Sequence, residues 1–127
     1  MTSTPGTEPI FDRQGRTVGW FDNGVIHEHS GHARAFVDNG VVVSYRAQHL
    51  GWLDQGYFRD RHGDAVGFIR GARSGPLPPH VSEPPVPPVL NVPPAPPVAP
   101  MPPAPAAPTL SWSSLDWEHY LGARPHE

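Results

Sequence analysis

The sequence predicts an all-β fold of four β-hairpins around a pseudo-fourfold axis, followed by a disordered proline-rich linker and a short C-terminal helix. Three observations support this prediction. Residues 9–72 form a sixteen-residue repeat without gaps, 16 of the 19 prolines lie between Pro76 and Pro108, and aromatic residues and leucines return after position 109. Dense proline allows neither a helix nor an interior strand, so the chain holds one small folded domain.

The repeat consists of four windows, 9–24, 25–40, 41–56 and 57–72. Three places define it: place two is apolar, place eleven is small and place twelve is aromatic. The residues are Ile10, Ile26, Val42 and Phe58 at place two, Gly19, Ala35, Gly51 and Gly67 at place eleven, and Trp20, Phe36, Trp52 and Phe68 at place twelve. Such recurrence indicates four copies of one structural unit.

Each window predicts two short strands joined by tight turns. Asp12 and Gly15 suit the first and fourth places of a type I turn, and the second and fourth windows repeat this arrangement. Between windows, Asp22-Asn23-Gly24 and Asp38-Asn39-Gly40 tolerate the positive φ that a two-residue hairpin turn needs. No segment before residue 110 has helical periodicity, so the repeat region is predicted to be entirely β.

Four units of this size are too small to form separate cores, so we expect them to share one. Places eleven and thirteen of the second strand face one side and places ten and twelve the other, and both sides are apolar or small. The small residues Gly19, Gly51 and Gly67 would let neighbouring backbones approach closely. We expect the core to be filled by Ile10 and the place-twelve aromatics Trp20, Phe36, Trp52 and Phe68, each contributing roughly 1.5 to 3 kcal/mol.

The repeat is flanked by segments of different character. Residues 1–8 are predicted to be a flexible N-terminus, and residues 73–108 a solvated polyproline-like linker that would reach roughly 110 Å if extended. The stretch 73–79 also matches a basic residue followed by PxxP, a match that arises easily in so proline-rich a segment.

Residues 109–127 form an aromatic tail in which we expect a helix over 114–121. Ser113 and Asp116 resemble a capping signature, and Gly122 offers a stop. A two-turn helix needs a surface on which to dock, which is either its own β domain or another protein. The candidate partner-binding residues are Trp112, Leu115, Trp117, Tyr120 and Leu121.

Composition excludes several classes of function. The net charge of −3 argues against nucleic acid as a partner, and the absence of cysteine excludes disulfides and thiolate metal sites. No signal peptide or membrane span is evident, so we expect a cytoplasmic protein, a monomer or small homo-oligomer, without a cofactor. All nine basic residues are arginine, which is typical of a GC-rich bacterial genome.

One histidine cluster is a candidate metal site. His27, His29 and His32 lie close together in the second window, and two or three imidazoles there would suit zinc or nickel. The simpler interpretation is the polar outer face of a hairpin, because the other windows lack metal ligands at these places. The recurring turn carboxylates bond their own backbone, and no catalytic motif is present, so we expect no enzyme.

The phrases Ile10–Gly15, His49–Trp52 and Asp60–Phe68 together resemble the bacterial 4-fold beta flower domain over residues 9–72. The resemblance implies hairpins arranged like petals around an axis, no assigned activity and no catalytic residue. Place ten departs from apolar at Arg34, and place three varies, so the chemistry is not fourfold symmetric.

These observations predict a non-enzymatic interaction or scaffold module with a protein partner, which its tethered tail would contact. The alternative is a metal- or small-ligand-binding domain that uses the His27, His29 and His32 cluster.

Overall fold

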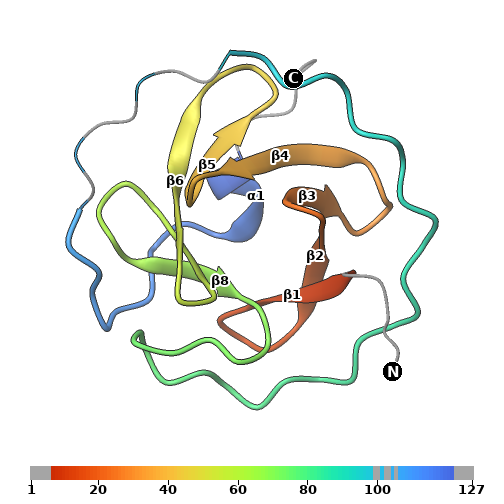
Figure 1. Cartoon of the computed structure of the whole chain (residues 1–127). Helices are drawn as coiled ribbons and strands as arrows, with labels where there is room; N and C mark the ends of the chain where they lie inside the picture. The colour runs from red at the N-terminus through yellow and green to blue at the C-terminus, as the bar shows by residue number, and fades with distance from the viewer. Residues whose placement is uncertain (1–6, 99–100, 102–103, 105, 122–127) are drawn as a thin grey trace.

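In the computed structural model, the described residues are 7–98, 101, 104 and 106–121. Eight antiparallel strands follow one another around a closed barrel, and the last pairs with the first (Figure 1). The strands are β1 (Glu8–Asp12), β2 (Thr17–Asp22), β3 (Val25–Glu28), β4 (Ala33–Asp38), β5 (Val41–Ser44), β6 (His49–Asp54), β7 (Tyr57–Arg59) and β8 (Ala65–Phe68), and one helix, α1 (Trp117–Leu121), follows them. The all-β class is confirmed, and the strands close into a barrel.

The strand pairing follows the sixteen-residue period of the sequence. Each window supplies one antiparallel pair, and the register of that pair shifts at the same place every time. The shifts fall between Ile10 and Phe11, Ile26 and His27, Val42 and Val43, and Phe58 and Arg59. An irregularity of this kind increases the local twist of a strand, which favours closure of a short-stranded barrel.

The turns between windows form one end of the barrel. Asn23 and Gly24 have φ values of 52° and 79°, and Asn39 and Gly40 have 53° and 80°. Two consecutive positive φ values define a type I′ turn, whose twist matches that of the flanking strands. The Asn-Gly pairs therefore determine where the first two windows end, and Gln55 and Gly56, also with positive φ, do so in the third.

The turns within windows form the other end. In the first window the amide of Gly15 donates to the carbonyl of Asp12 at 2.9 Å. The Asp12 carboxylate accepts the backbone amides of Gln14 and Arg16 at 2.9 and 3.0 Å. Asp60 makes the equivalent bonds in the fourth window. The carboxylates of Asp12 and Asp60 are thus engaged in turn formation.

The barrel interior contains Ile10, as expected, but not the aromatic residues of place twelve. The buried core consists of Ile10, Ile26, Ala35, Val42, Leu50, Phe58, Val66, Trp117, Tyr120 and Leu121. The expectation that the place-twelve aromatics fill the axis is wrong. A Cβ on Gly19 would lie 3.7 Å from Trp117 inside the barrel, so its neighbour Trp20 points outward. Trp20 and Phe68 are still buried, whereas Phe36 and Trp52 are half-buried.

The small residues at place eleven have two physical roles. A Cβ on Gly51 would lie 1.8 Å from the carbonyl oxygen of Arg59 on the next strand, and one on Gly19 would lie 2.5 Å from that of His27. Neither position has room for a side chain unless the backbone moves. The same Cβ on Gly51 would also lie 3.0 Å from the Tyr120 hydroxyl. Glycine here allows strands to approach and leaves space for the helix.

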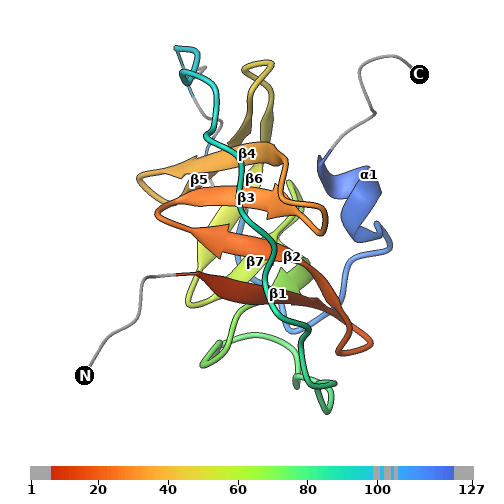
Figure 2. The same ribbon diagram turned by 90° about the vertical axis from the view of Figure 1, so that its right-hand side faces the viewer.

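The proline-rich segment encircles the barrel, and we call residues 73–110, where described, the belt (Figures 1 and 2). Ser82, Asn91 and Thr109 donate their backbone amides to the turn carbonyls of Gly15, Gly31 and Gly63 at 3.0, 3.0 and 3.1 Å. The expectation of a solvated, disordered spacer is therefore not confirmed. The turn carbonyls point outward and accept hydrogen bonds from the N–H groups of belt residues that are not proline.

The belt has its own sequence period of nine residues. It reads PHVSEPPVP over 79–87, PVLNVPPAP over 88–96 and PVAPMPPAP over 97–105. Ser82 and Asn91 occupy the same place in this period, and so does Thr109, two periods after Asn91. In the copy between Asn91 and Thr109 this place is occupied by Pro100, and proline has no N–H to donate. One nine-residue step of the belt thus corresponds to one sixteen-residue step of the barrel.

Helix α1 begins three residues later than predicted. Its first turn is capped by Asp116, whose Oδ1 accepts the backbone amide of His119 at 2.8 Å. The predicted stop at Gly122 and most of the predicted flexible N-terminus lie outside the described residues. Within the part of the chain that the structure describes, no helix has the length and apolar character needed to cross a membrane.

Candidate functional site

The tail helix closes one end of its own barrel (Figure 2). Trp117, Tyr120 and Leu121 are all buried in the barrel core. The Trp117 ring meets Phe58 edge-on, with centroids 5.5 Å apart, and stacks on Tyr120 at the same separation. Aromatic pairs at this separation add to the stabilisation that burial provides. The sequence left two docking surfaces open for the tail, its own β domain or another protein. In the structure the tail docks on its own β domain.

Polar contacts fix the helix in this position. The Tyr120 hydroxyl donates to the carbonyl of Arg59 at 2.9 Å. Burial raises the pKa of this hydroxyl well above its usual value, and the nearby Asp60 carboxylate raises it further, so the phenol keeps its proton. On the outer side of the helix, Arg34 lies 3.4 Å from Glu118 and 3.2 Å from Glu28. Arg34, which breaks the apolar pattern at place ten, thereby connects the helix to β3.

The remaining candidate partner-binding residues differ in exposure. Trp112 is half-buried, with ring centroids 6.1 Å from Tyr57 and 6.0 Å from Phe68. Leu115 is 40% exposed and lines a cleft at the same end of the barrel. Most of the apolar surface that suggested a partner is therefore turned toward the chain's own barrel.

The three histidines of the second window do not converge. His27 is buried, and its Nδ1 lies 3.1 Å from the carbonyl oxygen of Gly31. His29 is exposed beside the Trp20 ring, and His32 contacts Ser30 in the turn. Among the described residues, no group of three histidine or carboxylate side chains is arranged to hold a metal ion.

Arg59, at place three of the fourth window, connects the two ends of the belt and was missed by the sequence analysis. It is 2% exposed, and its Nη1 donates to the carbonyls of Gly63 and Thr109 at 2.6 and 2.9 Å. Its Nη2 donates to the carbonyl of Ser74 at 2.9 Å. The signal in the sequence was a charged residue within an otherwise apolar strand.

The belt carries most of the exposed apolar surface of the described chain. Its large apolar side chains with 75 to 92% exposure are Leu77, Val86, Val89, Val92, Val98, Met101 and Leu110. In contrast, the start of the belt is anchored through its backbone, because the Tyr57 hydroxyl donates to the carbonyl of Pro76. The belt is thus bonded to the barrel on one side and apolar on the other.

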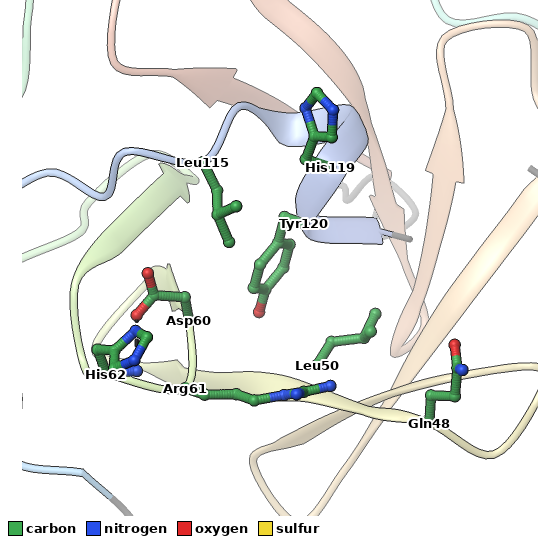
Figure 3. Close-up of a pocket in the computed structure, with 8 residues that line it drawn as sticks. All are labelled: Gln48, Leu50, Asp60, Arg61, His62, Leu115, His119 and Tyr120. Carbon is green, nitrogen blue, oxygen red and sulfur yellow. Dashed lines mark hydrogen bonds between the residues drawn. The ribbon is translucent and has the colours of Figure 1, made fainter. Parts of the chain in front are cut away.

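A cleft of about 310 Å³ lies between the tail and the turns of the third and fourth windows (Figure 3). Its lining residues are Gln48, Leu50, Asp60, Arg61, His62, Leu115, His119 and Tyr120. Leu115 and the Tyr120 ring point toward its centre, whereas the His119 ring points away from the other side chains (Figure 3).

Comparison with known proteins gave one result. No match was found among curated proteins or among solved structures. The family model described as 4-fold beta flower protein matches residues 8–121, a span that includes the barrel, the belt and helix α1. The sequence resemblance covered only the repeat, whereas the matched region extends to the last residue of the helix. This chain belongs to the 4-fold beta flower protein family.

Proposed function

We propose that this protein is a non-enzymatic interaction module that presents its belt to a protein partner. The observation that carries this proposal is the gathering of strongly exposed apolar side chains on a segment whose backbone is bonded to the barrel. Closing a barrel does not require exposed valines. Strongly exposed apolar side chains gathered on one segment are typical of sites that bind other proteins.

The chemistry of the belt indicates the kind of partner. Proline holds φ near −65° and biases the preceding residue toward an extended conformation, so the proline-rich arcs favour a polyproline II backbone. Such segments bind grooves lined with aromatic side chains. Because hydrogen bonds to Gly15 and Gly31 already order the belt, less conformational entropy is lost on binding than with a free peptide.

The nine-residue period supplies two closely similar ligands. Pro84-Pro85-Val86-Pro87 and Pro93-Pro94-Ala95-Pro96 occupy the same places in consecutive copies. They follow Ser82 and Asn91, which are bonded to the turns of adjacent windows. The two arcs therefore face different directions around the barrel, an arrangement suited to a divalent ligand.

The proposal of a non-enzymatic role rests on the state of the buried carboxylates. Asp60 accepts the amides of His62 and Asp64 and the hydroxyl of Ser113. A carboxylate whose oxygens already accept three hydrogen bonds in a turn is a poor general base, because those bonds occupy the positions that a substrate proton would need.

Titration with purified polyproline-binding domains tests the interaction. We expect at least one of a panel of SH3 and WW domains to bind the full chain saturably, and more tightly than a free peptide of residues 82–98. Val86→Asp together with Val92→Asp should weaken this binding at least tenfold without changing the melting temperature, since both side chains are exposed. Asn23→Asp together with Asn39→Asp, in two exposed turns, adds the same two negative charges and is the charge-matched control. Absence of saturable binding across the panel, or equal effects of both variants, would contradict the proposal.

A further inference from the structure

The cleft between the tail and the third and fourth windows is separate from the belt, since no residue of the belt lines it. Leu50, Leu115 and the ring of Tyr120 make its wall largely apolar (Figure 3). Its volume of about 310 Å³ lies at the small end of the range for ligand sites. The shape and lining therefore suit a compact apolar group.

Arg61 places a positive charge on this apolar cleft. Its Nε and Nη2 both donate to the carbonyl of His49, at 3.0 and 2.8 Å, which holds the guanidinium in one orientation. Among the described residues, no carboxylate lies within 4.0 Å of this guanidinium, whereas Arg16 and Arg59 each have one and Arg34 has two. Nη1 has no protein acceptor among the same residues and is available to a ligand.

Nearby groups leave the charge of Arg61 effective. The Asp60 carboxylate also lines the cleft, but it is buried, its oxygens accept three hydrogen bonds from other groups, and it forms no ion pair with Arg61. The pKa of His49 is lowered by burial and then by the positive charge of Arg61, in accordance with a positive potential at this wall. An arginine guanidinium pairs preferentially with a carboxylate, whose planar geometry it matches.

We propose that this cleft binds a small monocarboxylate with a compact apolar body. The carboxylate pairs with the Arg61 guanidinium, and the apolar body lies against Leu50, Leu115 and the Tyr120 ring. The Tyr120 hydroxyl is not available as a proton donor to the ligand, because it donates to the Arg59 carbonyl and keeps its proton. This activity is independent of the belt and would persist if the belt had no partner.

Phenylacetate is a suitable probe because it combines a carboxylate with one aromatic ring. In amide NMR titrations of the full chain we expect saturable shifts at His49, Arg61 and Leu115. Phenylacetamide, which lacks the charge, and acetate, which lacks the ring, should each bind at least tenfold more weakly. Equal binding of phenylacetate and phenylacetamide, or the absence of saturable shifts, would overturn the proposal.

Two variants assign the binding to the cleft. Arg61→Gln should weaken phenylacetate binding at least tenfold, whereas Arg46→Gln, at an exposed turn residue of the third window, should leave it unchanged. Equal losses in the two variants would show nonspecific charge attraction and overturn the proposal. Leu115→Ala should weaken binding several-fold while the fold is retained, because this side chain is partly exposed.

A short peptide ending in phenylalanine distinguishes the source of the carboxylate. Binding of the peptide with a free C-terminus, but not of its C-terminal amide, would support the same carboxylate recognition for a chain terminus. If the amidated peptide binds as well as the free peptide, the carboxylate is not what the cleft recognises.

Discussion

The barrel and the belt are both built from repeats, but different interactions hold them. Each sixteen-residue unit of the barrel contributes a ladder of strand hydrogen bonds and a buried place-two side chain such as Ile10 or Phe58. Each bonded step of the belt contributes a backbone N–H, such as that of Asn91, to a turn carbonyl, while its valines face solvent. The comparison indicates that the positions of the remaining N–H groups, as well as the density of proline, determine whether a proline-rich segment packs against a fold.

The largest effect is expected where the tail completes the barrel. Trp117→Ala should lower the free energy of unfolding by about 3 to 5 kcal/mol, because it removes a buried aromatic side chain from between Phe58 and Tyr120. Urea unfolding followed by circular dichroism measures this loss. Leu115→Ala, at a partly exposed residue of the same tail, should cost less than about 1 kcal/mol. Equal stabilities of the two variants would mean that the helix is not part of the core.

A smaller loss is expected where two strands of the barrel approach each other. Gly51→Ala should cost about 1 to 3 kcal/mol, because the new Cβ would meet the carbonyl of Arg59 and force the backbone to move. The reverse change at the equivalent place, Ala35→Gly, should cost only about 0.5 to 1 kcal/mol, as expected for glycine within a strand. Calorimetric melting of both proteins compares them. If Gly51→Ala melts like the wild type, the close approach is not a constraint.

The belt is expected to respond to loss of a backbone donor rather than of a side chain. Asn91→Pro removes the N–H that bonds the carbonyl of Gly31 at 3.0 Å and should cost about 0.5 to 1.5 kcal/mol. Asn91→Ala keeps that N–H and loses only an exposed side chain, so its stability should match the wild type. Unfolding in urea distinguishes the two variants. Identical curves would show that the belt bond contributes nothing.

The smallest effect is a gain at the turn of the third window. Ala47 has a φ of 64°, whereas the other windows have glycine at this place. Ala47→Gly should stabilise the protein by about 0.5 kcal/mol. Glycine relieves about 1 to 2 kcal/mol of strain that alanine has in the left-handed conformation. It also makes the unfolded chain more flexible, which opposes the gain by about 0.5 to 1 kcal/mol.

Thermal melting of Ala47→Gly beside Gly15→Ala tests this prediction. A Cβ at Gly15 would lie 2.2 Å from the carbonyl oxygen of His80 on the belt, so that variant should lose stability. A loss in both variants would show that the strain at Ala47 is not released by glycine.

The repeat region was largely predictable because its determinants are local. The Asn-Gly pairs require positive φ at Asn23 and Gly24, and the structure has both. Asp12 and Asp60 were assigned to turns from their spacing, and both accept the amides that such turns present. These features depend on residues two to four positions apart, so one sequence suffices to identify them.

The sequence alone did not determine the direction in which the aromatic side chains point. Trp20 and its equivalents were assigned to the axis, because both faces of the strand are apolar or small and periodicity cannot distinguish them. The interior is instead lined by place two, and by glycines that leave room for Trp117, which lies fifty or more residues further along the chain. The candidate cleft also combines Arg61 with Leu115, a pairing that sequence spacing could not indicate.

The period, the strands, the turns and the all-β class could be predicted from the sequence, because each follows from backbone preferences of neighbouring residues. Tertiary structure decided that the strands close into a barrel, that the belt encircles it and that the tail fills it. These three outcomes depend on contacts between distant segments. The free energy of those contacts comes from the burial of apolar surface and from hydrogen bonds to turn carbonyls of the barrel, such as those that the N–H groups of Ser82 and Asn91 donate.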